Sequence, residues 1–426
     1  MNGRYRDGFG RPIAVVTGIG VVTSLGIGKA DNWAGLTAGR SGIRQITRFP
    51  TDGLRTTVAG TVDFLFDGPV SAPTLSERLA TLAAEEAISE AGIGAKGVFP
   101  GPLFLAVPPV ELEWPERAMF ARATGLAGKV GYDEIMHGVD LDRPDIYETF
   151  LFGGVAERLA DRFGTEGAPI SLSTACASGA TAIQLGVEAI RRGEADATLC
   201  IGTDGSVHPE SLIRFSLLSA LSTSNNPPES APKPFARNRD GFVMAEGAGA
   251  LVLESLESAR RRGASILGVV SGSGERADSF HRTRSNPDGS AIIATIRNAL
   301  EDAGLEPDQI DYINAHGTGT PENDKMECLA VSAVFGERAK TLPISSNKSM
   351  VGHTLTAAGA VEAAFTLLTL QHQMLPPTIN HREPDPAIPL DVVPNEARPA
   401  KVSRAMSNSF GFGGQNVSLV FEREPA

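Results

Sequence analysis

The sequence predicts an α/β protein whose strands are covered by helices on both faces, and an internal match points to two related halves. Along 426 residues, short apolar and β-branched runs alternate with helical patterns, which is typical of this fold class. The segment 87–93 (AISEAGI) matches 299–305 (ALEDAGL), and the offset is almost half the chain. Each copy ends a helical pattern with Gly and precedes a loop and an apolar strand. Because so short a match can arise by chance, the duplication is a hypothesis at this point.

The elements of the first half follow from the spacing of apolar residues. The patterning is less regular at 100–150, which predicts an inserted or interface-forming region there. The predicted elements are a strand at 13–16, a helix at about 75–91, a strand at 169–172, a helix from 177 onward, and strands at 197–202 and 250–254.

The second half repeats this alternation, so most polar motifs fall at strand ends. We place the boundary between Ser255 and Gly263, which gives an N-terminal half of 1–257 and a C-terminal half of 258–426. The predicted elements are a helix at about 289–303, strands at 310–315 and 342–346, an Ala/Gly-rich helix at 355–373, and two strands that flank a Gly-rich turn near 411–414.

Composition and charge exclude several classes of protein. A net charge of -12, without a dense Lys/Arg run, argues against a nucleic-acid partner. Three cysteines far apart do not make a disulfide framework, and no C-x-x-C pair suggests zinc. No apolar signal region follows Met1, and no stretch of about twenty apolar residues suggests a membrane span. We therefore expect a cytoplasmic protein in a reducing compartment.

Cys176 is the first candidate for catalysis, because its segment 173–179 (STACASG) lies where a predicted strand gives way to a predicted helix. Unpaired N–H groups and the positive end of the helix dipole stabilise a thiolate at such a position. They would lower the thiol pKa below its free value of about 8.5. The position alone leaves this reading balanced against a small, buried core cysteine.

Two further segments place a histidine at a strand end beside small, flexible residues. They are 314–320 (NAHGTGT) and 347–353 (NKSMVGH). Histidine is the side chain most easily set to exchange protons near neutral pH, and the Gly and Thr neighbours would admit a substrate to the backbone. A zinc site would need an H-x-x-x-H pair or a Cys/His cluster in the sequence, so we expect no metal.

Two glycine-rich segments remain. The segment 409–416 (SFGFGGQN) lies between two apolar runs and could be a simple hairpin turn. Alternatively, its backbone could bring N–H donors toward a developing oxyanion. Near the start, Gly18-Ile19-Gly20 after a strand hints at dinucleotide binding, but Thr23 stands where the third glycine is needed, so we reject that function.

Taken together, these motifs resemble the elongating β-ketoacyl-acyl-carrier-protein synthases of the 3-oxoacyl-ACP synthase II type, within the thiolase superfamily. The segment 16–26 (VTGIGVVTSLG) is similar to the opening strand and turn of that family, and 240–249 (DGFVMAEGAG) is similar to its internal signature loop. The resemblance spans nearly the whole chain. It implies the thiolase fold, in which duplicated halves form a five-layered α-β-α-β-α sandwich, and usually a homodimer.

The resemblance also implies ping-pong covalent catalysis. Cys176 would take a fatty acyl group from an acyl carrier protein as a thioester. Malonyl carrier would then lose CO2 and attack this thioester, a decarboxylative Claisen condensation that adds two carbons. His316 and His353 would stabilise the enolate, and Lys348 would tune the charge of the network. No cofactor is implied, because the phosphopantetheine arm belongs to the carrier substrate.

The remaining roles are carried over from the family in the same way. The backbone N–H groups of Cys176 and Phe412 would form the oxyanion hole, and Phe412 would also act as a gate. Substrate contacts are expected from Thr283, Thr318 and Thr320. Asp324, equally interpretable as a solvated helix charge, would support the network. The other supporting positions are Glu327, Glu362, Gly411 and Gly413.

The chain departs from the family pattern at three places, and two rival functions are open. Gly179 is a mild change, the segment 146–154 replaces one that shapes the acyl pocket and the dimer interface, and Ser219 stands where relatives often place a basic residue for carrier docking. One rival is a non-catalytic chain-length partner of a heterodimeric synthase, against which the retained cysteine and histidines count. The other is a cysteine hydrolase, which would need a water-activating third group that is not evident.

Overall fold

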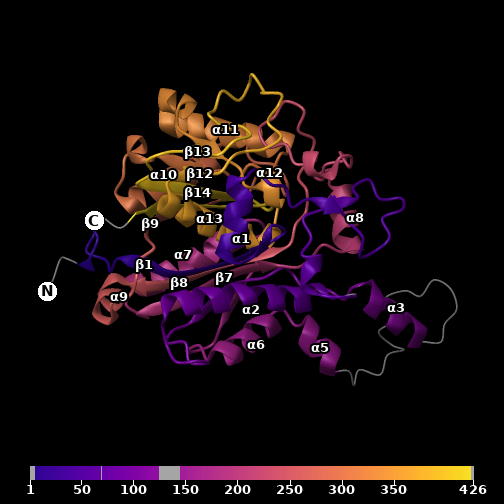
Figure 1. Cartoon of the computed structure of the whole chain (residues 1–426), viewed down its shortest axis with the longest axis horizontal. Helices are drawn as coiled ribbons and strands as arrows, with labels where there is room; N and C mark the ends of the chain where they lie inside the picture. Colours follow the sequence, from indigo (N-terminus) through magenta and orange to yellow (C-terminus); the bar gives the residue numbers. More distant parts are fainter. Residues whose placement is uncertain (1–4, 69, 124–143, 424–426) are drawn as a thin grey trace.

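The structure, a computed structural model, describes residues 5–68, 70–123 and 144–423, which form five alternating layers (Figure 1). One outer helical layer covers the strands of the first half, a central helical layer follows, and a second outer layer covers the strands of the second half. In this order the helices are α2 (Ala72–Ala91) with α6 (Gly154–Phe163), α7 (Ser178–Arg191) with α13 (Ala358–His372), and α10 (Ser290–Ala303) with α11 (Pro321–Phe335). The five-layered thiolase fold is thereby confirmed.

Within the described residues, ten strands follow one another in hydrogen-bonded order, and the second half mirrors the first. In each half the two inner pairs are antiparallel and the two outer pairs are parallel. The halves meet where β1 pairs with β9. From this centre outward the first half runs β1 (Ala14–Thr23), β8 (Gly247–Ser255), β7 (Ala197–Asp204), β5 (Leu103–Ala106) and β6 (Ile170–Leu172). The second half runs β9 (Gly268–Ala277), β15 (Gln415–Glu422), β14 (Arg404–Phe410), β10 (Tyr312–Asn314) and β11 (Ile344–Ser345).

Glycines in β1 and β9 let the outer helix of each half approach its strand closely. A Cβ atom on Gly18 would lie 2.0 Å from the carbonyl oxygen of Ala87 in α2. A Cβ atom on Gly272 would lie 2.4 Å from the carbonyl oxygen of Ala299 in α10. Ala87 and Ala299 open the two matched sequence segments, so the match marks equivalent helices. The same close approach recurs two residues along each strand, at Gly20 and Gly274.

Both of these helices end as their sequences predict. The last turn of α2 is followed by Gly92 with φ 57°, and that of α10 by Gly304 with φ 66°. This left-handed conformation costs glycine little, because it has no Cβ atom. Helix α2 also begins with a cap, since the side chain of Ser71 accepts from the N–H of Thr74 at 3.3 Å.

The structure corrects the sequence-based expectations in three places. β1 continues to Thr23, so Gly18 to Gly20 lie inside a strand and not after one. β5 lies within 100–150, where the sequence predicts irregular structure, because a strand of four residues carries too little periodicity to be recognised. The rest of that region holds α3 (Trp114–Ala123) and α5 (Pro144–Phe150), while 124–143 lie outside the described residues. The third place is β9, a long strand rich in Ser and Gly that the sequence does not predict.

Shorter elements complete the fold. They are α1 (Gly28–Thr37), α8 (Pro209–Leu217), α9 (Leu256–Arg262) and α12 (Lys348–Val351), with the short strand pairs β3 (Arg44–Gln45) with β4 (Val58–Ala59) and β12 (Met374–Leu375) with β13 (Arg398–Pro399). Helix α9 connects the two halves, and the predicted division at 257/258 falls inside it and stays a prediction. In the part of the chain that the structure describes, no helix combines the length and the apolar character that crossing a membrane requires.

Candidate active site

Cys176 lies in a sharp turn between β6 and α7. Ala175, directly before it, has φ 50°, a value that residues with a Cβ atom rarely adopt. The N–H of Ala177 donates to the carbonyl of Thr174 at 3.2 Å, and Ser178 Oγ accepts from the N–H of Thr174 at 2.7 Å. Helix α7 begins at Ser178, so the thiol stands just ahead of the helix, as the sequence predicts.

The surroundings of Cys176 contradict the predicted lowering of its pKa. Burial raises the pKa of the thiol to about 11, and the N–H of Phe412 and the ammonium of Lys348 oppose this rise only in part. The free energy needed to move a thiolate out of water is larger than the stabilisation that a nearby helix terminus provides. In addition, the N–H groups of Ala177 and Ser178 already bond to carbonyls of the turn. The thiol is therefore protonated at neutral pH.

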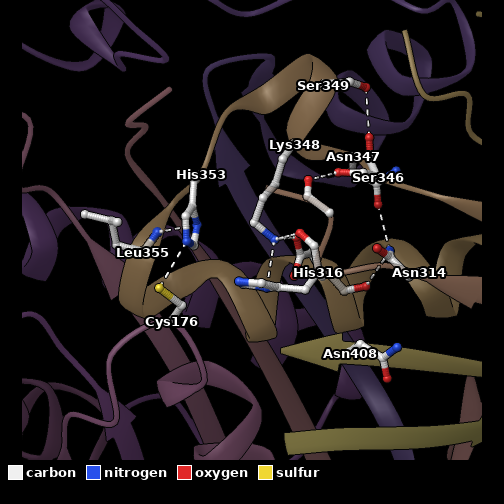
Figure 2. A network of polar contacts seen from close by, with 12 residues as sticks. Cys176, Asn314, His316, Ser346, Asn347, Lys348, Ser349, His353, Leu355 and Asn408 are labelled. Atoms are coloured by element: carbon white, nitrogen blue, oxygen red, sulfur yellow. Dashed lines mark hydrogen bonds and ion pairs between the residues drawn. The ribbon is translucent and has the colours of Figure 1, made fainter. Parts of the chain in front are cut away.

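His353 brings the second half of the chain to this thiol (Figure 2). Its Nε2 lies 3.1 Å from Cys176 Sγ, and its Nδ1 accepts from the backbone N–H of Leu355 at 3.2 Å. A ring nitrogen that accepts carries no hydrogen, so the hydrogen belongs on Nε2, which faces the sulfur. Burial and the charge of Lys348 lower the pKa of His353 well below its usual value, so the ring is neutral.

His316 lies beside His353, with the two ring centroids 5.3 Å apart at a steep angle. Lys348 Nζ lies 3.3 Å from His316 Nδ1 and donates to the carbonyl oxygen of the same residue at 2.7 Å. An ammonium has only donors, so Nδ1 accepts and the ring hydrogen again belongs on Nε2. Burial, followed by the charge of Lys348, lowers the pKa of His316 well below its usual value. The site therefore presents two neutral imidazoles, each with hydrogen on Nε2.

Lys348 is itself held by Glu362. Lys348 is 2% exposed, and its ammonium forms a short ion pair with Glu362 Oε1, which completes its set of three contacts. Burial raises the pKa of Glu362 to about 7, against the opposing effect of Lys348. The adjacent amides of Asn314 and Asn347 bond to each other at 2.7 Å (Figure 2). A buried lysine is costly unless it is paired, so Glu362 supports the position of Lys348.

Two acidic side chains of α11 hold the loop that carries His316. Glu327 accepts from the N–H groups of His316 at 2.9 Å and Gly317 at 2.8 Å, and burial raises its pKa to about 7. Asp324 accepts from the N–H groups of Phe235 at 2.7 Å and Gly319 at 3.2 Å. Asp324 is fully buried, so its interpretation as a solvated helix charge is wrong.

The glycine-rich turn lies directly against the thiol. It connects β14 to β15, and the backbone N–H of Phe412 donates to the sulfur of Cys176. A Cβ atom on Gly411 would lie 3.0 Å from the carbonyl oxygen of Thr174, so glycine permits this approach. Gly413 has φ 88°, which also favours glycine. The segment is thus both a hairpin turn and part of the site.

A pocket opens onto the sulfur and collects most of the predicted site residues. Thr318 Oγ1 and Thr320 Oγ1, 2.9 Å apart, lie on its wall. Lys348 and the three supporting acids contact the histidine loops instead. The sequence-predicted residues that line the pocket are Cys176, Thr283, His316, Thr318, Thr320, His353, Gly411, Phe412 and Gly413.

Two aromatic side chains of the site carry no role in the sequence-based hypothesis. The ring of Phe242 meets His353 edge-on at 5.2 Å, and the ring of Phe410 meets His316 at 5.9 Å. Both belong to motifs already singled out, 240–249 and 409–416. In the sequence, the only signal for these two residues was an aromatic side chain next to a glycine in each motif. The packing in the structure shows which histidine ring each of them contacts.

The thiol and the two histidines also have the spacing of metal ligands. Their ligating atoms all lie within 4.8 Å of one another. The ammonium of Lys348, 3.3 Å from His316 Nδ1, would repel a cation held there. That the site works without a metal stays a prediction.

Comparison with known proteins agrees with this geometry. The N-terminal domain of β-ketoacyl synthases matches residues 11–259, and the C-terminal domain matches 267–382. The 3-oxoacyl-[acyl-carrier-protein] synthase 2 of Coxiella burnetii is 36% identical over 420 residues, which is 96% of this chain and 98% of the relative. The tetracenomycin polyketide synthase ketoacyl synthase alpha subunit of Streptomyces glaucescens is 38% identical over 422 residues, 96% of each chain.

A solved structure supports the same assignment. It contains a type II PKS acyl-carrier protein in complex with its ketosynthase bound to the hexaketide. The matched chain is 32% identical, with a TM-score of 0.86 over 97% of this chain and 99% of the other. The chain therefore belongs to the β-ketoacyl synthase family, whose members are condensing enzymes of the acyltransferase class.

Proposed function

We propose that the protein elongates a fatty acyl chain by two carbons, using malonyl-acyl carrier protein in a decarboxylative Claisen condensation. The observation that carries this proposal is the 3.1 Å contact between Cys176 Sγ and His353 Nε2, with His316 beside it. A nucleophile and two neutral hydrogen-bond donors thereby face one pocket. Relatives of this chain include both 3-oxoacyl-ACP synthases and polyketide ketosynthases, so the fatty acyl substrate is part of the proposal.

The first half-reaction loads the thiol. Cys176 Sγ attacks the thioester carbon of an acyl carrier, the new C–S bond forms, and the bond to the carrier sulfur breaks. The thiol proton leaves with the released carrier thiol, so the charges balance. The tetrahedral oxyanion would be held by the N–H groups of Cys176 and Phe412, and losing one such donor costs about 3 kcal/mol.

The second half-reaction forms the carbon–carbon bond. The malonyl group loses CO2, and the electron pair of the broken bond becomes an enolate on the carrier thioester. The Nε2 hydrogens of His316 and His353 would donate to the enolate oxygen. The enolate carbon then attacks the Cys176 thioester and releases the thiolate, which takes up a proton from solvent to restore the thiol, leaving a 3-oxoacyl chain on the carrier.

The neutral state of both histidines suits this role. Their pKa values are lowered well below the usual range by burial and by Lys348. They therefore keep their Nε2 hydrogens as donors over the physiological pH range and do not titrate. Lys348 would fix the His316 ring and contribute a positive charge near the enolate.

We propose an acyl carrier protein as the partner and its phosphopantetheine arm as the group that enters the pocket. Thr283, Thr318 and Thr320 would hydrogen-bond the arm, and Phe412 would act as a gate. Carriers are acidic, and the chain has a net charge of -12, so docking needs a local basic surface. Arg282 and Arg284 flank Thr283, are exposed, and form no ion pair with any side chain in the described ranges.

A cytoplasmic homodimer is also proposed. β6 ends the sheet of the first half, which leaves one edge of the strand without a partner among the described residues. Its Ile170 is 44% exposed. An apolar side chain on a free strand edge suits pairing with a second copy.

Two other functions are less well supported. A non-catalytic chain-length partner has no need of a thiol in contact with an imidazole. A cysteine hydrolase would need a group that activates water, but the Nε2 hydrogens of both histidines make them donors toward the pocket. Condensation uses all three groups as the structure presents them.

The proposal is tested by condensation assays with purified protein. Malonyl carrier is mixed with acyl carriers of graded length, and 3-oxoacyl product and CO2 are measured. We expect one range of chain lengths to be elongated and Cys176→Ala to form no product. Cys200→Ala, which alters a buried cysteine of β7 outside the pocket, is the matched control and should retain activity.

Two further variants refine the result. Cys176→Gln should leave malonyl decarboxylation without condensation, because both histidines remain. Arg282→Gln/Arg284→Gln should raise the KM for the carrier and leave kcat unchanged. Normal condensation by Cys176→Ala would rule out the covalent mechanism, and a wild type inactive with every carrier would favour the chain-length partner.

A further inference from the structure

The carboxylate of Asp204 ties the first half of the chain to the turn that follows His353. Asp204 is the last residue of β7 and is 1% exposed. Its Oδ2 accepts from the backbone N–H of Thr356 at 3.1 Å and lies 2.7 Å from the hydroxyl of Thr356, whose one hydrogen is shared with the carbonyl oxygen of Thr203, also at 2.7 Å. Its Oδ1 accepts from the N–H of Ser206 at 3.0 Å. The side chain is thereby fixed on both oxygens.

One of the two residues between His353 and Thr356 has a strained backbone. Leu355 has φ 47°, a left-handed conformation that is unfavourable for a residue with a Cβ atom. Such a conformation persists only where the surroundings hold it. The hydrogen bonds of Asp204 act on the next residue, Thr356, and so hold the peptide that follows Leu355.

The strained turn sets the hydrogen position of His353. Leu355 N–H donates to Nδ1 of the ring at 3.2 Å, which leaves the ring hydrogen on Nε2, 3.1 Å from the sulfur of Cys176. If the turn relaxed, Nδ1 would lose its donor and the ring could carry its hydrogen there instead. Nε2 would then present a lone pair to the pocket.

We propose that Asp204 is a positioning residue that fixes the tautomer of His353 by holding the turn at Leu355 and Thr356. Its kinetic consequence rests on the proposed function, because only the Nε2–H form donates to an enolate oxygen. Asp204 touches neither the sulfur nor the imidazole in any hydrogen bond of the described residues. It acts through backbone geometry, from the half of the chain opposite to the histidine.

The decisive measurement reads the tautomer directly. Wild type and Asp204→Asn are labelled with 15N-histidine, and His353→Gln assigns the signals of His353. We expect the Nε2–H form in the wild type and a mixture with the Nδ1–H form in Asp204→Asn. The asparagine keeps the shape but turns an amide N–H toward one of the two anchoring donors.

Kinetics provide the second readout. Asp204→Asn should lower kcat for condensation by at least about tenfold, with the KM for malonyl carrier within about twofold of wild type. Glu254→Gln is the matched control, since Glu254 is equally buried but pairs with Arg262 and Thr17. It should change neither the tautomer nor kcat.

If Asp204→Asn does not fold, Thr356→Val is used, which removes the hydroxyl and keeps the N–H. It should shift the tautomer in the same direction by a smaller amount. An unchanged tautomer in a folded Asp204→Asn or Thr356→Val overturns the inference, whatever the activity. A wild type that carries the Nε2–H form but condenses nothing would instead refute the proposed function alone.

Discussion

The two halves of the molecule use the same unit of strand, turn and helix to present different chemical groups. In the first half, five residues (173–177) join β6 to α7 and include Cys176. In the second half, twelve residues (346–357) join β11 to α13 and include Lys348 and His353. β6 and β11 are the outermost strands of their halves, and α7 packs against α13 in the central layer.

This difference shows how a duplicated scaffold acquires a reaction. The shared fold brings the starts of two central helices together, and glycine permits this closeness, since a Cβ atom on Gly179 would lie 2.5 Å from Ala360 N and one on Gly359 would lie 2.4 Å from Ala180 N. The short connection buries a thiol beside α7. The longer one carries a lysine and an imidazole, and reaches back to the thiol at 3.1 Å. We therefore expect the first half to carry the acyl group and the second half to generate the enolate.

The largest effect is expected from removing the histidines. His316→Ala and His353→Ala should each lower malonyl decarboxylation by about 10²–10⁴-fold, because a donor to the enolate is lost. Loading of Cys176 from an acyl carrier, followed by mass spectrometry, should continue in both. His372→Gln, at the exposed end of α13, is the control. If the variants lost acyl loading as well as decarboxylation, the assignment of loading to the first half and of enolate formation to the second half would be wrong.

Breaking the buried ion pair of the second half should cost stability. Lys348→Met leaves Glu362 buried without its partner, which typically costs about 3–5 kcal/mol in the free energy of unfolding. Denaturant titration measures this. Lys340→Met removes an exposed pair with Glu337 and should cost less than about 1 kcal/mol. A double variant, Lys348→Met/Glu362→Leu, should regain stability but not activity.

The shared close approach of helix and strand predicts similar, smaller losses in the two halves. Gly18→Ala and Gly272→Ala each place a Cβ atom against a helix carbonyl, at 2.0 Å and 2.4 Å. Overpacking of this kind costs about 1–3 kcal/mol. Gly153→Ala, with nothing within 4 Å of the new atom, is the control. If only one of the two strand variants is destabilised in a denaturant titration, the two halves do not both depend on a close approach of helix to strand.

The smallest perturbation is a change of pH, which titrates the thiol without any substitution. Since burial raises the pKa of Cys176 to about 11, its alkylation by iodoacetamide should rise about tenfold per pH unit from pH 7 to 10. A raised pKa also means that this thiol's contribution to stability is complete below about pH 8.5 and is lost as the pH rises toward 11. Cys200→Ser removes a competing cysteine. A rate that levels off below pH 8 would show that the helix terminus outweighs burial.

Local patterns were sufficient for much of the fold and for naming the residues that the structure brings together at the candidate site. The apolar spacing predicted α7, α10 and α13 and most long strands, and the matched segments at 87 and 299 correctly marked equivalent helices. The same patterns missed β5 and β9 because one is short and the other is rich in Ser and Gly. They also placed Gly18 to Gly20 after a strand, because a close helix approach leaves no trace in local sequence.

The sequence by itself determined which groups were available: one cysteine ahead of a helix, two histidines in flexible loops, a lysine and a glycine-rich turn. Motif order and residue type carry that information, because each motif is local. Only the tertiary structure decided their states. Burial by both halves raises the pKa of the Cys176 thiol instead of lowering it. Hydrogen bonds from Leu355 and Lys348 to the Nδ1 atoms of the two histidines leave their ring hydrogens on Nε2. We infer that Asp204, in the first half, holds the turn that follows His353 in the second half. These effects depend on solvent exclusion and on tertiary contacts, of which Cys176 with His353 and Asp204 with Thr356 join residues more than a hundred positions apart, and no local pattern encodes them.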